Sequence, residues 1–179
     1  VNYGQSTNDV IPTAGKMTVI QLSKDLRQEL TRLASAFGDK AKEFDHIIKM
    51  GRTQMQDAIP IRLGQEFTAY QEAVERNIRR LDKVLEEMHQ VNLGGTAIGT
   101  GLNADRFYVD HVVPKLAEYS QLPLVQTEDL IDGTQHIDAF AAVSSQLKNC
   151  AIAFSKIAND LRLMSSGPKT GFNEINLPK

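Results

Sequence analysis

The sequence has little of what marks several common classes of protein. Cys150 is the only cysteine, so the chain cannot form an internal disulfide, which fits a reducing compartment. No apolar run reaches ~18 residues, the length that indicates a membrane-spanning helix, and there is no basic-then-apolar leader. A net charge of −2 gives no reason to expect binding to nucleic acid or to an anionic membrane. We therefore expect a cytoplasmic protein with no nucleic-acid or membrane partner.

The length and the two ends indicate how the chain is organised. At 179 residues with 41% hydrophobic content, it is long enough for one domain with a sizeable core, so we treat residues 1–179 as one domain. It begins on Val1 rather than Met and stops at Lys179 after a loop-like stretch. We expect it to be an internal piece of a longer polypeptide.

Apolar residues recur every three or four positions in several stretches, which is the period of an amphipathic helix. The first stretch predicts a helix that begins near Pro12 and breaks at Gly38, followed by a short helical piece at 40–45. Residues 47–50 should be extended or irregular. Further helices are predicted over residues 63–90, 106–119 and 134–164.

The apolar faces of these helices are too wide for so small a chain to bury. On the last helix, for example, Val143 and Cys150 widen a stripe that already contains Leu147, Phe154 and Ile157. We therefore predict an all-α fold, a bundle of long helices that associates into a homo-oligomer. Cys150 should be a buried, small apolar residue rather than a nucleophile.

Four polar or glycine-rich segments interrupt the helices, at residues 5–9, 51–60, 94–103 and 165–178. In the first, Ser6, Thr7 and Asn8 place three uncharged hydrogen-bonding side chains ahead of a helix. Free N–H groups and the helix dipole favour a carboxylate at such a position. The alternative is a polar entry turn, because the same residue types are the usual helix caps.

The second segment offers a hydroxyl and an amide at Thr53 and Gln54. Arg52 adds a cation that could bind a carboxylate, but we favour an internal ion pair, for which Asp57 is a candidate, because buried arginines are usually paired within the protein. Neutral donors, joined by an arginine if one is free, suit a small dianion. Such a site fits proton abstraction next to a carboxylate, where fixed donors stabilise an aci-carboxylate-like state.

The sequence gives less support to nucleotide binding, metal binding or a catalytic Ser-His-Asp arrangement. Gly99-x-Gly101-x-x-Ala104 matches the dinucleotide fingerprint formally, but a helix rather than a strand precedes it, which excludes nucleotide binding. The four histidines have no metal-ligand spacing, and His136 is expected to cap or pack a helix. No Ser-His-Asp arrangement can be assembled.

Taken together, QSTND-x-x-PTA, GRTQ-x-QDA-x-P, GGTAIGTGLN and SSGP…NEINLP resemble the aspartase/fumarase superfamily in their order and spacing. The resemblance covers essentially the whole chain. It implies the central helical domain of a homotetramer, with composite active sites built from three subunits. It also implies that Ser6, Thr7 and Asn8 are one substrate-binding element, and that Thr53 and Gln54 are a second element from another subunit. No metal or organic cofactor is expected.

Within that superfamily, Gln54, TQHIDAF and NEINLP are more similar to aspartases than to class II fumarases, which typically carry histidine in place of Gln54. Glutamine cannot shuttle protons. The resemblance therefore implies a carbon–nitrogen lyase that removes the Cβ proton of L-aspartate and releases ammonia and fumarate. The base would be a serine in a GSSxMPxKxN loop beyond Lys179, so no catalytic base can be named and the chain alone should be inactive. A class II fumarase (fumarate hydratase) and a non-catalytic helical assembly module are the alternatives.

Overall fold

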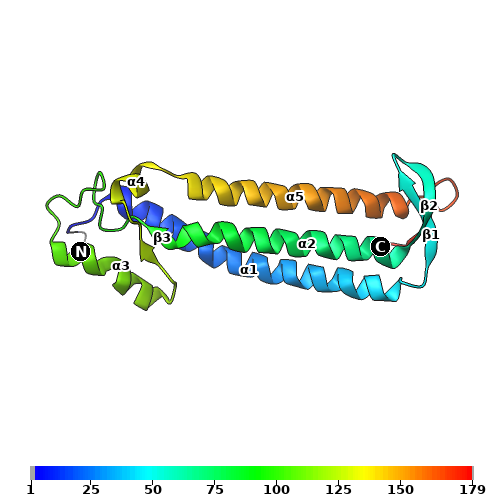
Figure 1. Ribbon diagram of the computed structural model, residues 1–179, viewed down its shortest axis with the longest axis horizontal. Helices are drawn as coiled ribbons and strands as arrows, with labels where there is room; N and C mark the ends of the chain where they lie inside the picture. The colour runs from blue at the N-terminus through cyan, green and yellow to red at the C-terminus, as the bar shows by residue number, and fades with distance from the viewer. Residues whose placement is uncertain (1–2, 179) are drawn as a thin grey trace. The chain divides into compact units, whose positions relative to one another are not determined.

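The computed structural model describes residues 3–178, and Val1, Asn2 and Lys179 lie outside this range. The described residues form an all-α fold with two small pairs of strands, which confirms the predicted fold class (Figure 1). The helices are α1 (Thr7–Glu43), α2 (Leu63–Glu86), η1 (Glu87–His89), α3 (Arg106–Ser120), α4 (Leu130–Gln135) and α5 (Asp138–Met164). The strands are β1 (Ile48–Thr53), β2 (Gln56–Arg62), β3 (Gln90–Val91) and β4 (Val125–Gln126).

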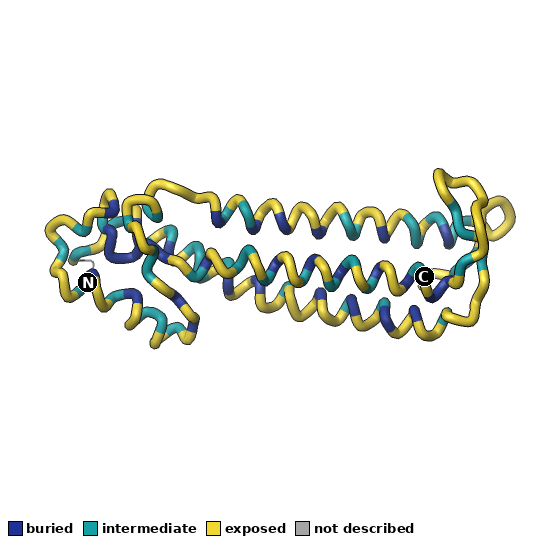
Figure 2. The backbone as a smooth tube through the Cα atoms, viewed as in Figure 1, coloured by how far each residue is buried: buried dark blue, intermediate teal, exposed yellow. Residues whose placement is uncertain are grey.

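The chain folds into two compact units. The first comprises the residues up to Gln28 together with Arg80–Ser145, and the second comprises Glu29–Arg79 together with the residues from Gln146 onward. Buried residues recur at intervals along α1, α2 and α5 (Figure 2), as the helical period of the sequence predicts. No helix among residues 3–178 has the length and apolar character needed to cross a membrane.

The core of the first unit is aliphatic. Met88, Val91 and Val113 are at most 1% exposed and pack with buried residues of α1 and α5. The strands β3 and β4, joined by parallel pairing of Gln90 with Val125, lie in this unit. The predicted 63–90 helix is therefore too long at its end, because α2 stops at Glu86 and the chain continues through η1 into β3.

The core of the second unit is built around aromatic rings. Phe67 and Tyr70 of α2 are buried, with ring centroids 5.6 Å apart in an edge-on arrangement. Phe37 of α1 lies 5.7 Å from the Tyr70 ring, and Ile157 and Met164 of α5 complete the cluster. Such edge-to-face contacts add to the stabilisation from apolar burial.

Helix α1 starts earlier than the sequence predicted, at Thr7 rather than near Pro12. The proline lies inside the helix, where it cannot donate the backbone hydrogen bond that the carbonyl of Asn8 would normally accept. The side-chain amide of Asn92 donates to that carbonyl instead, at 3.0 Å. A distant side chain thus supplies the missing donor and allows the helix to begin one turn ahead of the proline.

The predicted break at Gly38 is wrong, since α1 is continuous to Glu43. A Cβ at this glycine would lie only 2.7 Å from Oε1 of Gln71 on α2. Gly38 therefore permits a close approach of the two helices rather than ending one of them.

The last predicted helix is divided. Helix α4 ends at Gln135, and α5 begins at Asp138 rather than at Thr134. His136 adopts extended backbone angles at the C-cap of α4, and its Nδ1 lies 2.8 Å from Oδ1 of Asp132. This position agrees with the predicted capping role of His136.

Candidate functional sites in the two units

The predicted element Ser6–Asn8 forms the start of α1 in the first unit. The Ser6 hydroxyl accepts a hydrogen bond from the backbone N–H of Asn8 at 3.1 Å, and the Ser6 N–H donates to the Asp9 carboxylate at 2.9 Å. This reciprocal pattern is a capping box. Thr7 and Asn8 are exposed, so their side chains lie at a solvent-accessible helix N-terminus.

Asp9 ties this helix start to the glycine-rich segment. It is fully buried, and its Oδ2 accepts hydrogen bonds from the N–H groups of Gly94 at 3.2 Å and Thr96 at 3.0 Å. The amide of Asn8 donates to the Ala97 carbonyl at 2.7 Å. The glycine-rich loop is thus held against the start of α1 by two adjacent side chains.

The second predicted element, Thr53 and Gln54, lies at the turn of the β1–β2 hairpin in the second unit. Gln54 and Met55 both have positive φ, 51° and 63°, as the central residues of a two-residue hairpin turn of type I′ require. Thr53 and Gln54 are exposed. Of the stretch 47–50 that the sequence predicted to be extended or irregular, residues 48–50 lie in β1 and Ile47 comes just before it.

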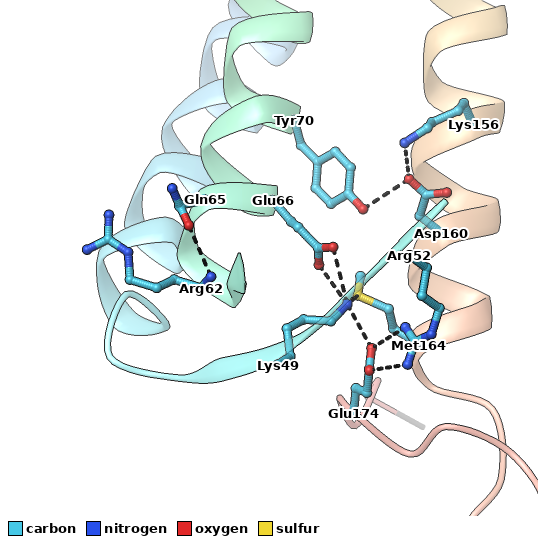
Figure 3. Close-up of polar contacts among 10 residues, drawn as sticks. All are labelled: Lys49, Arg52, Arg62, Gln65, Glu66, Tyr70, Lys156, Asp160, Met164 and Glu174. Atoms are coloured by element: carbon cyan, nitrogen blue, oxygen red, sulfur yellow. Dashed lines mark hydrogen bonds and ion pairs between the residues drawn. The ribbon is translucent and has the colours of Figure 1, made fainter. Parts of the chain in front are cut away.

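Four charged side chains form a cluster that joins the hairpin to its neighbours (Figure 3). Lys49 and Arg52 come from β1, Glu66 comes from α2, and Glu174 comes from the segment after α5. Nζ of Lys49 is 2.9 Å from carboxylate oxygens of both Glu66 and Glu174. Arg52 donates two hydrogen bonds to Glu174, at 3.1 and 2.5 Å. The Lys49 side chain is only 8% exposed, and two cations face two carboxylates.

The predicted internal pairing of Arg52 is present, but its partner is not Asp57. Asp57 is the cross-strand neighbour of Arg52, whereas the guanidinium binds the carboxylate of Glu174 and stacks 3.8 Å from the Phe172 ring centroid. The bidentate geometry with Glu174 gives two parallel, charge-assisted hydrogen bonds, which accounts for this choice.

The ion pairs also set the protonation of the cluster. Burial opposes ionisation of Glu174, but hydrogen bonds and charges from Arg52 and Lys49 outweigh burial and hold the pKa of Glu174 below its usual value. The hydrogen bond from Arg52 to Glu174 raises the pKa of the guanidinium. Both members of the pair therefore stay charged at neutral pH.

Lys49, Arg52 and Glu66 of this cluster line a pocket of about 330 Å³. Tyr70 donates to Asp160 at 3.1 Å, and Lys156 binds the same carboxylate (Figure 3). Burial, followed by the charge of Asp160, raises the pKa of Tyr70, so its hydroxyl stays protonated as a donor. Met55 of the hairpin turn also lines this pocket.

The five predicted substrate-binding residues thus fall into two groups, Ser6–Asn8 in the first unit and Thr53–Gln54 in the second. Asp9, Asn92 and Glu174 had no assigned role in the sequence analysis. The spacing Ser6-x-x-Asp9 is a capping-box signal that could have identified Asp9. Glu174 gave no such signal, because it is separated from Arg52 by 122 positions.

The contacts of Cys150 and Gly99 indicate that these two residues serve packing. Cys150 is buried, as predicted, but its Sγ lies 3.4 Å from Oδ1 of Asn77 rather than among purely apolar groups. Gly99 has φ of +87°, and a Cβ there would lie 2.4 Å from the Cα of Ile131, so this glycine serves close backbone packing. Across residues 3–178, no three His, Cys, Asp or Glu side chains are grouped as a metal site.

Known proteins match this chain along nearly its full length. The family described as Lyase matches residues 1–179. The aspartate ammonia-lyase of Bacillus subtilis is 53% identical over 99% of this chain, and that of Escherichia coli is 47% identical over 100% of this chain. The chain spans only 38% and 37% of these two relatives.

Solved structures give the same family. A fumarate lyase:delta crystallin from Brucella melitensis, bound to cobalt, has a TM-score of 0.97 and 45% identity over 99% of the chain and 38% of its own. A class II fumarase from Schistosoma mansoni has a TM-score of 0.88 and 29% identity over 95% of the chain and 39% of its own. Because the family model matches residues 1–179, this chain belongs to the lyase family.

Proposed function

We propose that the chain is part of an aspartate ammonia-lyase, a carbon–nitrogen lyase that interconverts L-aspartate with fumarate and ammonia. The observation that carries the proposal is 53% identity, over 99% of the chain, to a protein named aspartate ammonia-lyase. A match of this length includes all four polar segments. The proposal concerns a full-length protein that contains this chain, because the chain spans 38% of that relative.

In this proposal the start of α1 binds one carboxylate of the substrate. Thr7 and Asn8 are exposed beside the N-terminus of a 37-residue helix, where the helix dipole favours negative charge. Asp9 is also negative, but its carboxylate is buried and occupied by three backbone N–H groups. It therefore fixes the site rather than competing for it.

Thr53 and Gln54 form the second binding element, contributed by another copy of the chain in a homotetramer. Their hydroxyl and amide are neutral donors on a hairpin turn, so they can bind carboxylate oxygens without titrating. As the Cβ proton leaves, charge accumulates on the adjacent carboxylate, and fixed donors stabilise that aci-carboxylate state more than the substrate. The base is proposed to be a serine outside this chain, and no metal or organic cofactor takes part.

The binding roles are tested in the full-length protein with Asn8→Ala and Thr53→Val, and with Thr18→Val as the matched control. Thr18 is an exposed residue of α1 whose hydroxyl bonds only its own helix, at 2.8 Å to Ala14. We expect a higher KM for L-aspartate in the two site variants, with an unchanged oligomeric state by light scattering. Failed assembly with a normal KM in the assembled fraction would instead mean that Asn8 and Thr53 have a structural role in assembly and do not bind the substrate.

A class II fumarase is the second candidate, because a solved structure with that title shares the fold at 29% identity. Gln54 argues against it, since a glutamine cannot act as a proton shuttle. If the parent protein releases ammonia from L-aspartate in step with fumarate, the ammonia-lyase proposal holds. Hydration of fumarate to malate without ammonia chemistry would replace it with the fumarase.

A further inference from the structure

The β1–β2 hairpin depends on side-chain anchors because it buries little surface of its own. Six of the seven residues of β2 are exposed, and two-stranded hairpins are marginally stable alone. In β1 the partly buried positions are Lys49, Gly51 and Arg52. The polar contacts of Lys49 and Arg52 therefore have a large part in deciding where the turn lies.

These two cations converge on one carboxylate. Residues three apart in a regular strand point to opposite faces of the sheet. The pairing register shifts between Met50 and Arg52, and such irregularities bend and twist a strand locally. Across this irregularity both Lys49 and Arg52 reach Glu174, at 2.9 and 2.5 Å.

Glu174 is itself fixed in place by the end of α5. Its backbone N–H donates to the carbonyl of Met164 at 2.8 Å, and the N–H of Asn173 donates to Ser166 at 2.7 Å. The bond to Met164 satisfies a carbonyl that the last turn of a helix leaves without a partner, and the bond to Ser166 holds the segment just after it. The carboxylate is thus held from α5, and Phe172 of the same segment covers the guanidinium of Arg52.

The turn follows directly from the anchored residue. Thr53 is the next residue after Arg52, about 3.3 Å further along the strand, and Gln54 follows it. The Arg52 side chain is 16% exposed and the Glu174 side chain 16%, so solvent weakens their pairing little. A small displacement of Arg52 would carry both turn residues with it.

We propose that Glu174 is a positioning residue for the Thr53–Gln54 turn: by binding Lys49 and Arg52 together, it holds the hairpin in the position from which these two residues meet the substrate. The inference rests on the proposed function for its effect on turnover. Its structural part, the anchoring of the hairpin, stands on the contacts of the second unit alone.

The test uses the full-length protein with Glu174→Gln, Arg52→Gln and the double variant. Glu174→Gln keeps the shape of the side chain and removes the charge. We expect kcat/KM for L-aspartate to fall by up to about 100-fold, the cost of a small misplacement, mainly through a higher KM. Because Glu174→Gln already removes the charge that both Lys49 and Arg52 bind, the double variant should be no worse than Glu174→Gln.

The matched control is Asp45→Asn, which removes the ion pair that Asp45 forms with Arg62 of β2, at 3.0 Å. This pair is 52% and 54% exposed, so its loss should leave KM and kcat unchanged. An equal effect of Asp45→Asn and Glu174→Gln on KM would overturn the proposal, since any loosening of the hairpin would then suffice.

Hydrogen exchange of the amides in residues 48–62 measures how firmly the hairpin is held, independently of turnover. Faster exchange in Glu174→Gln than in Asp45→Asn supports the anchor, and equal exchange overturns it. Faster exchange with unchanged kcat/KM overturns the positioning role. If the unaltered protein forms no fumarate from L-aspartate, the proposed function fails, while the exchange result still decides whether Glu174 holds the hairpin.

Discussion

Replacing Asp9 with asparagine should loosen the glycine-rich loop without unfolding the protein. The carboxylate accepts from Ser6 through Oδ1, and from Gly94 and Thr96 through Oδ2. Asparagine has one acceptor oxygen and one NH₂ group. Whichever way it turns, the NH₂ group faces a backbone N–H donor that it cannot satisfy.

The cost follows from these three hydrogen bonds. A hydrogen bond to a charged group contributes about 1.5–3 kcal/mol, and its loss in a buried site leaves the donor without a partner. With its oxygen toward the loop, asparagine keeps two uncharged hydrogen bonds to Gly94 and Thr96, and with its NH₂ group toward the loop it keeps neither. The loop amides should therefore open more easily by up to about that amount, which is up to roughly 10- to 100-fold in exchange rate at about 1.4 kcal/mol per factor of ten. Asp9→Ala, which removes all three acceptor contacts, should have a larger effect.

The assay is native-state hydrogen exchange of residues 92–101 in the full-length protein. Asp25→Asn is the control, because Asp25 is an exposed residue of the same helix. Unchanged protection of the loop in both Asp9 variants would refute the reasoning, since it would mean that the carboxylate does not hold Gly94 and Thr96.

Two further predictions follow from single contacts. Because the pKa of Glu174 is held low, its contribution to stability is present above its ordinary pKa and is lost as pH falls through the lowered value. The difference in free energy of unfolding between the parent and Glu174→Gln should be constant above about pH 5 and shrink in acid, and a pH-independent difference would contradict this. Gly99→Ala should destabilise the protein by about 2 kcal/mol or more, since the new Cβ meets Ile131 Cα at 2.4 Å. Gly15→Ala, inside α1 and 3.3 Å from the Phe140 ring, should change stability by less than about 1 kcal/mol in the same thermal unfolding experiment, and equal effects would contradict the packing argument.

The periodic parts of the fold could be predicted from the sequence. Helix α3, predicted over 106–119, ends one residue later, and α5 ends at Met164 as predicted. Amphipathic period is a local property, so it can be read from a single sequence. The start of α1 could not be, because the carbonyl left without a donor by Pro12 receives one from Asn92, 84 positions away.

The hairpin shows a second limit. Its turn residues Gln54 and Met55 have positive φ, yet neither is the Gly, Asn or Asp that normally indicates such a turn. The partner of Arg52 depends on tertiary packing, and the nearby Asp57 was the natural but wrong candidate. The substrate-binding roles of Ser6, Thr7, Asn8, Thr53 and Gln54 stay predictions.

The most direct test of the central claim uses a full-length protein containing this chain, with fumarate followed by its ultraviolet absorbance. L-aspartate and L-malate are supplied in separate reactions at equal concentration. An aspartate ammonia-lyase forms fumarate from L-aspartate and none from L-malate, and this is the result that we expect. Fumarate from L-malate alone would contradict the claim and identify the protein as a fumarase.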